Sequence, residues 1–466
     1  MISFAIADYF VLIIYAGLVV AVGTLAARRK SGAIDYLLAG RTLTLPMFVA
    51  TLVSTWYGGI LGVGEFSYLY GISNWVVQGV PYYIFALIFA LFLAKKIRTT
   101  NVVTIPDRLE QIYDRKTAVL GGVLAFLLCS PAPYLLMIGL LLQVIAGWDL
   151  LPCLLIGACV SSGVLFAGGF RADVYTDAFE FIVMFIGFGV ILPYAAASLG
   201  GFDYIQENVP SLHLTWRGGN SPQFIAVWFF IAMWTLVDPS FHQRCSAATS
   251  GTVARNGILL SIPFWFLFDA MTATTGLYAR AALPGLEQPV LAYPLLAERI
   301  LPPVAKGLFY AGMFATIMST LNTMTFISAT SLGRDILWRI LGKGDEQRAE
   351  QYSRWGIPAT ILLAIGLCFL VPSVIRLWYV IGTVIVPGLL IPLITGYFER
   401  WSVGPRYAFV AMILGWSTST GWLIGGWTEE FGVSTGYPLG IEPMFAGLAA
   451  SLVVWGIGWV KKKRED

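Results

Sequence analysis

A row of hydroxyl side chains lies inside one of the longest apolar stretches of the sequence, residues 303–333. Thr316, Ser319, Thr320 and Thr323 recur at a spacing of i, i+3, i+4 and i+7, which puts four hydroxyls on one helical face. A hard monovalent cation needs several oxygen ligands, and hydroxyls supply them without a fixed charge. The same groups can instead bond between helices or to their own backbone, and on the stripe alone that structural role is the better interpretation.

Two other apolar stretches are interrupted near their middle. Residues 54–59 read Ser-Thr-Trp-Tyr-Gly-Gly, and each glycine weakens a helix by roughly 1 kcal/mol relative to alanine. Five stretches later, Asp238-Pro239 places a proline where it removes a helical hydrogen bond. Close helix packing and a simple kink would explain either interruption alone. Their matched placement favours two broken helices, as in transporters with inverted repeats, whose sites lie near the bilayer midplane.

Few acidic residues lie within the apolar stretches, and a charge at the centre of a membrane helix costs about 2.5–3.5 kcal/mol. Each of these acids is therefore a candidate site residue. We expect Asp8 to be interfacial, and Asp177 and Glu180 to lie near the inner end of their helix, where water reaches them. Asp238 and Asp269 are expected to lie deeper, and Glu65 is the sixth acid of this kind.

The elements that must position these residues are membrane helices. The chain has 466 residues, of which 58% are hydrophobic and 12% charged, about half the usual charged share of a soluble domain. This composition argues against a soluble enzyme, a disordered scaffold and a nucleic-acid binder. Long continuous apolar stretches also exclude an outer-membrane barrel, whose strands alternate in short segments.

We predict an all-α integral membrane protein with about thirteen transmembrane helices. They cover residues 3–27, 44–70, 74–97, 118–147, 149–167, 177–198, 222–243, 256–279, 303–333, 356–374, 376–397, 406–425 and 441–460. These form one transporter domain over residues 1–466, with a leading helix (3–27), a first repeat (44–198), a second repeat (222–397) and trailing helices (406–460). A short amphipathic helix is predicted on the inner surface over residues 104–115.

The basic residues orient these helices in a cell membrane. The first residues lack the positive region of a signal peptide, and the cluster Arg28-Arg29-Lys30 follows the first helix, which predicts an N-terminus outside the cell. With thirteen helices, 24 of the 29 basic residues then fall in inner loops and the C-terminus is cytoplasmic. The five on the outer side are Arg217, Arg280, Arg299, Lys306 and Arg376.

Three local sequences resemble the sodium:solute symporter family. Residues 168–177 (GGFRADVYTD) are the clearest match, and residues 238–244 (DPSFHQR) with Ala247-Ala248 and residues 318–321 (MSTL) are similar to two further family motifs. The resemblance covers about residues 5–400 in order. It implies a LeuT-like fold, in which spans 2–6 and 7–11 form inverted repeats, and a transporter that moves a solute together with sodium.

The resemblance implies a main sodium site. Carried over by position, its ligands are the backbone carbonyls of Leu52, Thr55 and Thr316 and the hydroxyls of Ser319 and Thr320, which turns the hydroxyl stripe into an ion site. Some family members bind a second sodium ion. The corresponding residues here are Asp177, Asn322 and Thr323, of which Asn322 departs from the family's serine.

The resemblance also indicates solute-binding positions. Gly58, Gly59 and Gln78 stand where the family's sugar transporters carry polar or acidic ligands, and Asp238 falls near another such position. Two glycines in place of side chains put a sugar substrate in doubt. Exposed backbone N–H groups suit a carboxylate instead. We therefore expect a small carboxylate-bearing or zwitterionic metabolite.

Other side chains have less certain roles. Asp238, Glu65 or Asp269 can face a substrate ammonium, and the last two are candidates for a coupling acid. Trp56 and Tyr57 can close over the solute, although aromatic packing in the core is the better interpretation.

Several alternatives stay open. The same fold can couple to protons through Asp238 or Asp269, or carry a sugar with sodium. A membrane sensor or enzyme is a further alternative, but neither His213 nor His242 lies deep in a predicted helix and no nucleophile–base pair or metal cluster is visible. We expect no enzymatic activity, no cofactor beyond sodium as the coupling ion, and no nucleic-acid partner. The lipid bilayer and a small solute are the expected partners.

Overall fold

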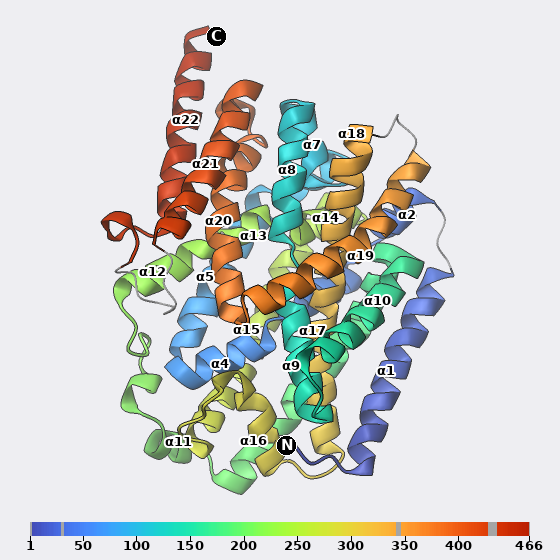
Figure 1. Ribbon diagram of the computed structural model, residues 1–466, viewed down its shortest axis with the longest axis vertical. Helices are drawn as coiled ribbons and strands as arrows, with labels where there is room; N and C mark the ends of the chain where they lie inside the picture. The colour runs from blue at the N-terminus through green and yellow to red at the C-terminus, as the bar shows by residue number, and fades with distance from the viewer. Residues whose placement is uncertain (1, 29–31, 342–345, 427–435, 466) are drawn as a thin grey trace.

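The computed structural model describes residues 2–28, 32–341, 346–426 and 436–465 (Figure 1). Three basic residues from the charge division, Arg29, Lys30 and Lys343, lie outside these ranges. Every named element within the described ranges is helical, which confirms the predicted all-α class.

The chain up to residue 208 forms eleven α-helices and two short segments of other winding. They are α1 (Ile6–Ala27), α2 (Ala33–Leu38), η1 (Ala39–Arg41), α3 (Leu45–Trp56), α4 (Ile60–Tyr70), η2 (Trp75–Gly79), α5 (Val80–Phe92), α6 (Ala94–Thr99), α7 (Ile105–Ile112), α8 (Arg115–Leu128), α9 (Ala132–Ala146), α10 (Leu150–Leu199) and α11 (Phe202–Asn208).

The rest of the chain continues in the same way. Its elements are η3 (Ser211–Leu214), α12 (Pro222–Ile231), α13 (Trp234–Val237), α14 (Pro239–Ala247), α15 (Gly251–Ala282), η4 (Pro289–Leu291), α16 (Ala292–Ile300), α17 (Ala305–Thr330), η5 (Ser331–Trp338), α18 (Arg339–Leu341), α19 (Glu346–Leu370), α20 (Val374–Thr395), η6 (Glu399–Trp401), α21 (Pro405–Gly425), η7 (Pro438–Gly440) and α22 (Pro443–Glu465).

Each of the thirteen predicted ranges overlaps one of these helices. In the described part of the chain, ten helices are long and apolar enough to cross a membrane, and the bent pair α3–α4 makes eleven. Helix α10 counts once among them although it covers two predicted ranges, and α17 is not among them. The number thirteen therefore stays a prediction.

Helix α10 is too long for one crossing. A straight helix of its 50 residues would measure about 75 Å, whereas the hydrocarbon core of a bilayer is about 30 Å thick. Gly169 interrupts it with a φ of 57°, a conformation that glycine adopts without steric cost. The two predicted ranges 149–167 and 177–198 lie on either side of this interruption.

Both predicted breaks are present. The first separates α3 from α4 at residues 57–59 and bends the pair by 57°. The second lies between α13 and α14, where Asp238 leaves helical geometry with φ −67° and ψ 115° just before Pro239. The chain thus carries non-helical backbone in the middle of two apolar stretches.

One predicted span contains a break that the sequence analysis did not anticipate. The range 118–147 lies almost entirely in one candidate membrane span, Arg115–Ala146, but within it α8 ends at Leu128 and α9 begins at Ala132. Pro131 and Pro133 lie at this boundary and cannot supply the N–H groups that a continuous helix needs. The amphipathic helix expected over 104–115 is confirmed as α7, and Thr104 caps it by accepting a hydrogen bond from the Asp107 N–H.

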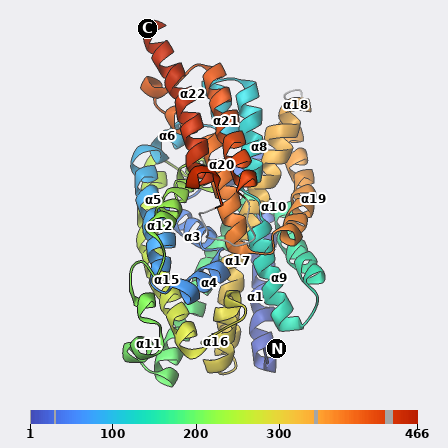
Figure 2. The same ribbon diagram turned by 60° about the vertical axis from the view of Figure 1, so that its left-hand side comes forward.

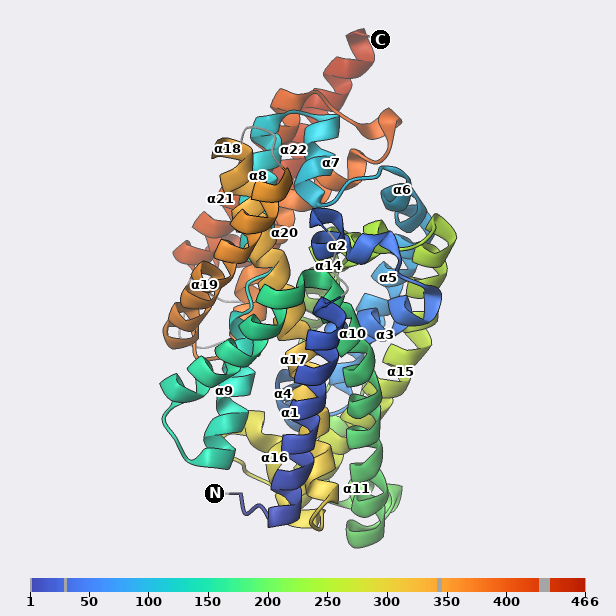
Figure 3. The same ribbon diagram turned by 90° about the vertical axis from the view of Figure 1, so that its right-hand side faces the viewer.

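The helices surround α17, which runs along the long axis near the middle of the molecule (Figure 1). Figure 3 shows α1 lying alongside α10 and α17, and these three helices contact one another. Figure 2 shows α5, α12 and α15 on one side of the molecule and α19 on the other. The N-terminus and the C-terminus lie at opposite ends of the long axis (Figures 1 and 3).

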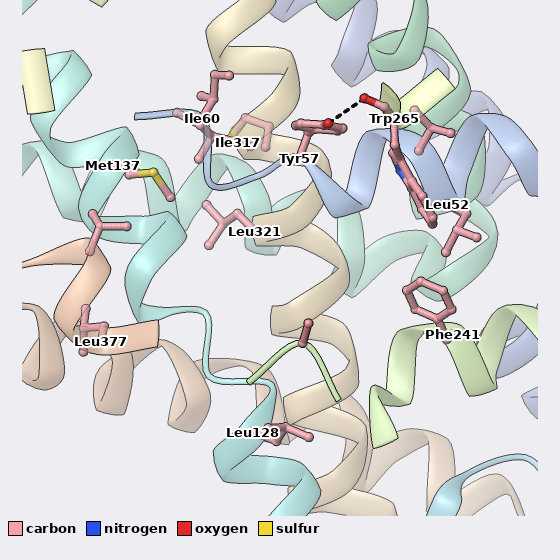
Figure 4. Close-up of a cluster of buried hydrophobic side chains, with 14 of the residues drawn as sticks. Leu52, Tyr57, Ile60, Leu128, Met137, Phe241, Trp265, Ile317, Leu321 and Leu377 are labelled. Atoms are coloured by element: carbon pink, nitrogen blue, oxygen red, sulfur yellow. Dashed lines mark hydrogen bonds between the residues drawn. The ribbon is translucent and has the colours of Figure 1, made fainter. Parts of the chain in front are cut away.

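Buried apolar side chains hold the first break against its neighbours (Figure 4). Leu52 and Ile60, on either side of the break, belong to the same core cluster as Ile317 and Leu321 of α17. The Tyr57 hydroxyl donates to the carbonyl of Trp265 on α15 at 2.8 Å. This packing fixes the non-helical segment directly beside the hydroxyl-rich face of α17.

Candidate functional site

Four of the residues expected at the main sodium site come together at the first break. The Thr320 hydroxyl donates to the Thr55 carbonyl and lies 3.4 Å from the Thr316 carbonyl. The Ser319 hydroxyl lies 3.4 Å from the Thr55 hydroxyl. Leu52, the fifth, lies on α3 one turn before Thr55 and is buried.

Further oxygens complete this group. The Ser319 hydroxyl donates to Asp177 Oδ1 at 2.6 Å and to the Ser54 hydroxyl at 3.0 Å. The Thr51 hydroxyl donates to Asp177 Oδ2. We call the set of Thr51, Ser54, Thr55, Asp177, Ser319, Thr320 and Thr323 the ion-ligand cluster.

Gly58 explains why α3 approaches α17 so closely. A Cβ atom at this position would overlap the Thr320 side chain. The absent side chain therefore lets the Thr320 hydroxyl reach the carbonyl of Thr55. Gly58 was expected to bind solute, but it lies against the expected sodium site instead.

A buried arginine occupies the centre of the ion-ligand cluster. Arg244 Nη2 lies 3.0 Å from Asp177 Oδ2, 2.6 Å from the Thr55 hydroxyl and 3.1 Å from the Thr323 hydroxyl. Both Arg244 and Asp177 are completely buried. Two expectations are therefore wrong: Arg244 is not an inner-loop residue, and Asp177 is not solvated.

Only two of the three residues expected to bind a second sodium ion lie in the ion-ligand cluster. Asp177 and Thr323 both contact the Arg244 guanidinium, and the Thr323 hydroxyl donates to Asp173 Oδ2 at 2.6 Å. Asn322 is fully buried, and neither polar atom of its amide has a hydrogen-bond partner. It lies on the same helix as Thr323 but contributes nothing to the ion-ligand cluster.

Three carboxyl groups follow one face of α10. Asp173, Asp177 and Glu180 are spaced i, i+4 and i+7, and all three are completely buried. Glu180, which was also expected near water, accepts a hydrogen bond from the Tyr15 hydroxyl at 3.1 Å. The Arg244 guanidinium neutralises one carboxylate, so the remaining acid groups favour protons or a bound cation nearby.

A cavity of about 100 Å³ lies beside the ion-ligand cluster, and aromatic side chains form much of its wall. Its lining residues are Thr55, Trp56, Tyr57, Gly59, Val63, Gln78, Tyr82, Tyr134, Trp228, Ile231, Trp234, Asp238, Asp269, Met324 and Trp378. We call it the aromatic cavity. Trp56, Tyr57, Gly59, Gln78, Asp238 and Asp269 were expected at the site from the sequence, whereas Gly58 and Glu65 do not line it.

Five aromatic lining residues were not expected: Tyr82, Tyr134, Trp228, Trp234 and Trp378. They lie within apolar stretches, where an aromatic residue that lines a cavity looks the same as one that packs in the core. Thr51 of the ion-ligand cluster was missed as well, and so were Arg244 and Asp173, which contact the cluster. Arg244 directly follows the predicted range 222–243 and the largely polar residues 238–243, so the sequence placed it in a loop.

The two carboxylates of the aromatic cavity are held in place by local hydrogen bonds. Asp238 caps α14, and its Oδ1 accepts from the Ser240 N–H at 2.7 Å. Asp269 on α15 accepts from the Tyr83 hydroxyl. Both are at least 95% buried, and the described residues that line this cavity include no basic side chain. A positively charged group is therefore the electrostatic complement of this cavity.

Two broken helices packed around a central polar helix define a membrane transporter of the LeuT-like fold. Solved structures agree. A Na+-coupled sialic acid symporter in a substrate-bound outward-open state superimposes with a TM-score of 0.80 at 15% identity, covering 98% of both chains. A nucleobase-cation-symport-1 family transporter in a closed conformation gives a TM-score of 0.61 at 13% identity, over 92% of this chain and 95% of that one.

The family follows from the sequence comparisons. The family model for the sodium:solute symporter family matches residues 36–415, so the chain belongs to this family. It is 27% identical over 433 residues to a sodium/pantothenate symporter of Escherichia coli, covering 87% of this chain and 88% of that protein. It is also 24% identical over 409 residues to a high-affinity choline transporter of Torpedo marmorata, covering 80% of this chain and 68% of the relative.

Proposed function

We propose that this protein imports a small organic solute into the cell together with sodium, by alternating access. The observation that carries the proposal is the position of Thr55. Its carbonyl accepts from Thr320 within the ion-ligand cluster, and the same residue lines the aromatic cavity. One residue at a helix break therefore belongs to both the candidate ion site and the candidate solute site.

Sharing Thr55 gives sodium and solute a physical means of coupling. A sodium ion bound by the Thr55 carbonyl and the Ser319 and Thr320 hydroxyls would replace their mutual hydrogen bonds and hold α3 against α17. A cavity wall fixed in this way loses less freedom when the solute binds. The solute strengthens sodium binding by the same factor, because coupling between two binding sites is reciprocal.

Of the two expected solute classes, carboxylate-bearing and zwitterionic, the residues that line the aromatic cavity favour the zwitterion. Asp238 and Asp269 suit an ammonium group, and the surrounding tryptophan and tyrosine rings attract cations through their faces. Gly59 precedes the N-terminus of α4 and provides no side-chain cap, and the free N–H groups of this helix end suit a carboxylate. Relatives are named for choline and for pantothenate, so they do not select a solute class.

Uptake into proteoliposomes tests the proposal. Purified protein is first screened against a panel of small zwitterions and organic cations for thermal stabilisation that requires sodium, because a ligand stabilises the state that it binds. Uptake of the best solute is then measured with and without an inward sodium gradient. Ser319→Ala with Thr320→Ala should weaken sodium activation at least about tenfold, as each lost contact to a charged ligand contributes about 1.5–3 kcal/mol.

The control for this double variant is Thr325→Ala, a buried hydroxyl of α17 outside the ion-ligand cluster with no hydrogen-bond partner. It should leave uptake close to that of the unaltered protein. Equal uptake without a sodium gradient, combined with an unaffected double variant, would reject sodium coupling. Uptake that follows a pH gradient and ignores sodium would favour the proton-coupled alternative through Asp238 or Asp269.

For the orientation in the membrane, we propose that the N-terminal end faces outside and the C-terminal end faces the cytoplasm. The support is the division of basic residues, 23 of 28 on the expected inner side once the buried Arg244 is set aside, together with termini at opposite ends of the long axis. A cysteine introduced at Ser3 should react with a membrane-impermeant thiol reagent added to intact cells. Labelling only after the cells are opened would reverse the orientation.

A further inference from the structure

A second cavity, of about 20 Å³, lies apart from the aromatic cavity, beside the C-terminal end of α17. It is bordered by the start of α7, by α8 and α14, and by the junction of α17 with η5. Its lining residues are Val103, Thr104, Ile105, Pro106, Ala125, Pro239, Gln243, Ile327, Thr330, Ser331 and Asp335. A space of this size holds about one water molecule or one small ion.

Three oxygens in the lining of the second cavity lack hydrogen-bond partners. They are Oε1 of Gln243, Oγ1 of Thr330 and Oδ2 of Asp335, in side chains that are 8%, 4% and 0% exposed. Gln243 donates through Nε2 to the carbonyl of Leu37 at 3.0 Å, which leaves its Oε1 without a donor. Buried polar atoms without partners are rare and costly, so this group requires an occupant.

The chemistry of these oxygens limits the occupant. An amide oxygen and a carboxylate oxygen only accept hydrogen bonds, whereas the Thr330 hydroxyl can donate or accept. One water molecule could satisfy all three by accepting from Thr330 and donating to the other two, and a hard monovalent cation could gather the three oxygens at once, so the choice between them depends on the local charge. The helix also changes to π winding at Ser331, a feature often found at functional sites.

The charges beside the second cavity favour a cation. Asp335 belongs to a group that we call the ion-pair cluster, formed by Asp107, Glu110, Arg334, Asp335 and Arg339. Three carboxyl groups face two guanidinium groups, which leaves one net negative charge when all three carboxyl groups are ionised. Asp335 directs Oδ1 to Arg334 at 2.7 Å and accepts there from the Thr104 hydroxyl at 2.9 Å, whereas its Oδ2 is the atom without a partner.

We propose that Gln243, Thr330 and Asp335 form a monovalent-cation site through which sodium passes on its way from the ion-ligand cluster to the C-terminal end. Thr330 lies ten residues beyond Thr320 on the same helix, a distance of about 15 Å. Gln243 immediately precedes Arg244 at the centre of the ion-ligand cluster. The inference that this site binds a cation follows from the local chemistry and charge. Its role in the release of sodium rests on the proposed function.

Radioactive sodium binding to the purified full-length chain tests the site, with ²²Na+ followed by scintillation proximity. Unaltered protein should show a stronger and a weaker component. Thr330→Val removes one oxygen at nearly constant volume and should weaken the weaker component at least about tenfold, while the stronger component is retained and reports a folded protein. Thr325→Val on the same helix, which lies outside the second cavity, should leave both components unchanged.

The outcomes separate this site from the proposed function. A single component in unaltered protein, or a weaker component that Thr330→Val leaves unchanged, would overturn the cation site. Ser319→Ala with Thr320→Ala should remove only the stronger component. If that variant changes neither binding nor uptake, the main sodium assignment fails even where the Thr330 result stands. A structure of protein soaked in Tl+ should show anomalous scattering between Gln243, Thr330 and Asp335.

Discussion

A single guanidinium holds the ion-ligand cluster together. Arg244 on α14 contacts Asp177 and the hydroxyls of Thr51, Thr55 and Thr323. These partners come from three other helices, α3, α10 and α17, so four helices meet at this side chain. Removing one partner of a buried ion pair leaves the other charge without compensation, which costs far more than the pair itself contributes.

Arg244→Gln should therefore destabilise the protein by about 3–5 kcal/mol, because Asp177 stays buried without its counter-charge. Adding Asp177→Asn to Arg244→Gln should recover part of this loss, since the uncompensated charge is then gone. Denaturant unfolding of purified protein in detergent measures both changes. Lys116→Gln, an exposed basic side chain, is the control. A double variant that loses the sum of the two single losses would show that the pair is not coupled.

At the scale of single elements, the broken helices were predictable because glycine and proline change backbone geometry locally. The boundary between α8 and α9 was predictable in principle from Pro131 and Pro133, but strong hydropathy concealed it. The aromatic cavity was not predictable beyond its residues near the breaks. Trp228, Trp234 and Trp378 are brought to it by packing between distant helices, and a single sequence contains no trace of that contact.

The contact between the first break and α17 can be tested at Gly58. Gly58→Ala adds a methyl group that overlaps the Thr320 side chain, so α3 and α17 must separate. Sodium activation of uptake should weaken at least about tenfold, as the Thr55 carbonyl and Thr320 hydroxyl move apart. Gly163→Ala on α10 is the matched control, because a Cβ atom there meets nothing within 4 Å. Equal losses in both variants would point to a general effect on folding.

At the scale of the whole molecule, polar contacts tie elements together at each end. Near the N-terminus, Asp8 Oδ1 accepts from the backbone N–H groups of Val304 and Gly307 at 2.8 and 2.9 Å, which joins α1 to the start of α17. At the opposite end, Asp107 on α7 pairs with Arg334 at 2.9 Å and with Arg339 at 2.6 Å. Both ties use sequence positions far apart, which explains why sequence reasoning predicted the helix α7 but not its partners.

The contribution of the Asp107 ion pairs to the stability of the fold should depend on pH. Burial raises the pKa of the Asp107 carboxyl, but the guanidinium groups of Arg334 and Arg339 outweigh it and lower the pKa to about 2. Because the pKa is lower in the folded state, this carboxylate stabilises the fold above pH 4 and the contribution, about 2 kcal/mol, is lost as the pH falls from about 4 to 2. Asp107→Asn should lose it at every pH.

Thermal unfolding of the purified protein at pH 7, 4 and 2.5 measures this contribution. The unaltered protein and Asp107→Asn should differ in melting temperature at pH 7, and the difference should be much smaller at pH 2.5. Glu399→Gln, which removes a charge in η6 away from the ion-pair cluster, is the control. A constant difference between the unaltered protein and Asp107→Asn over the whole range would show that the side chain acts through its shape and not through its charge.

The guanidinium of Arg244 also has an electrical consequence. A carrier that returns empty across a membrane would otherwise move the bare Asp177 carboxylate through the field, and 100 mV acts on one such charge with about 2.3 kcal/mol. Because Arg244 travels with Asp177 as a covalently attached counter-ion, that pair contributes no net charge to the return step. Under the proposed function, the membrane voltage would act on the step that carries sodium inward and would not act on this pair when the empty carrier returns.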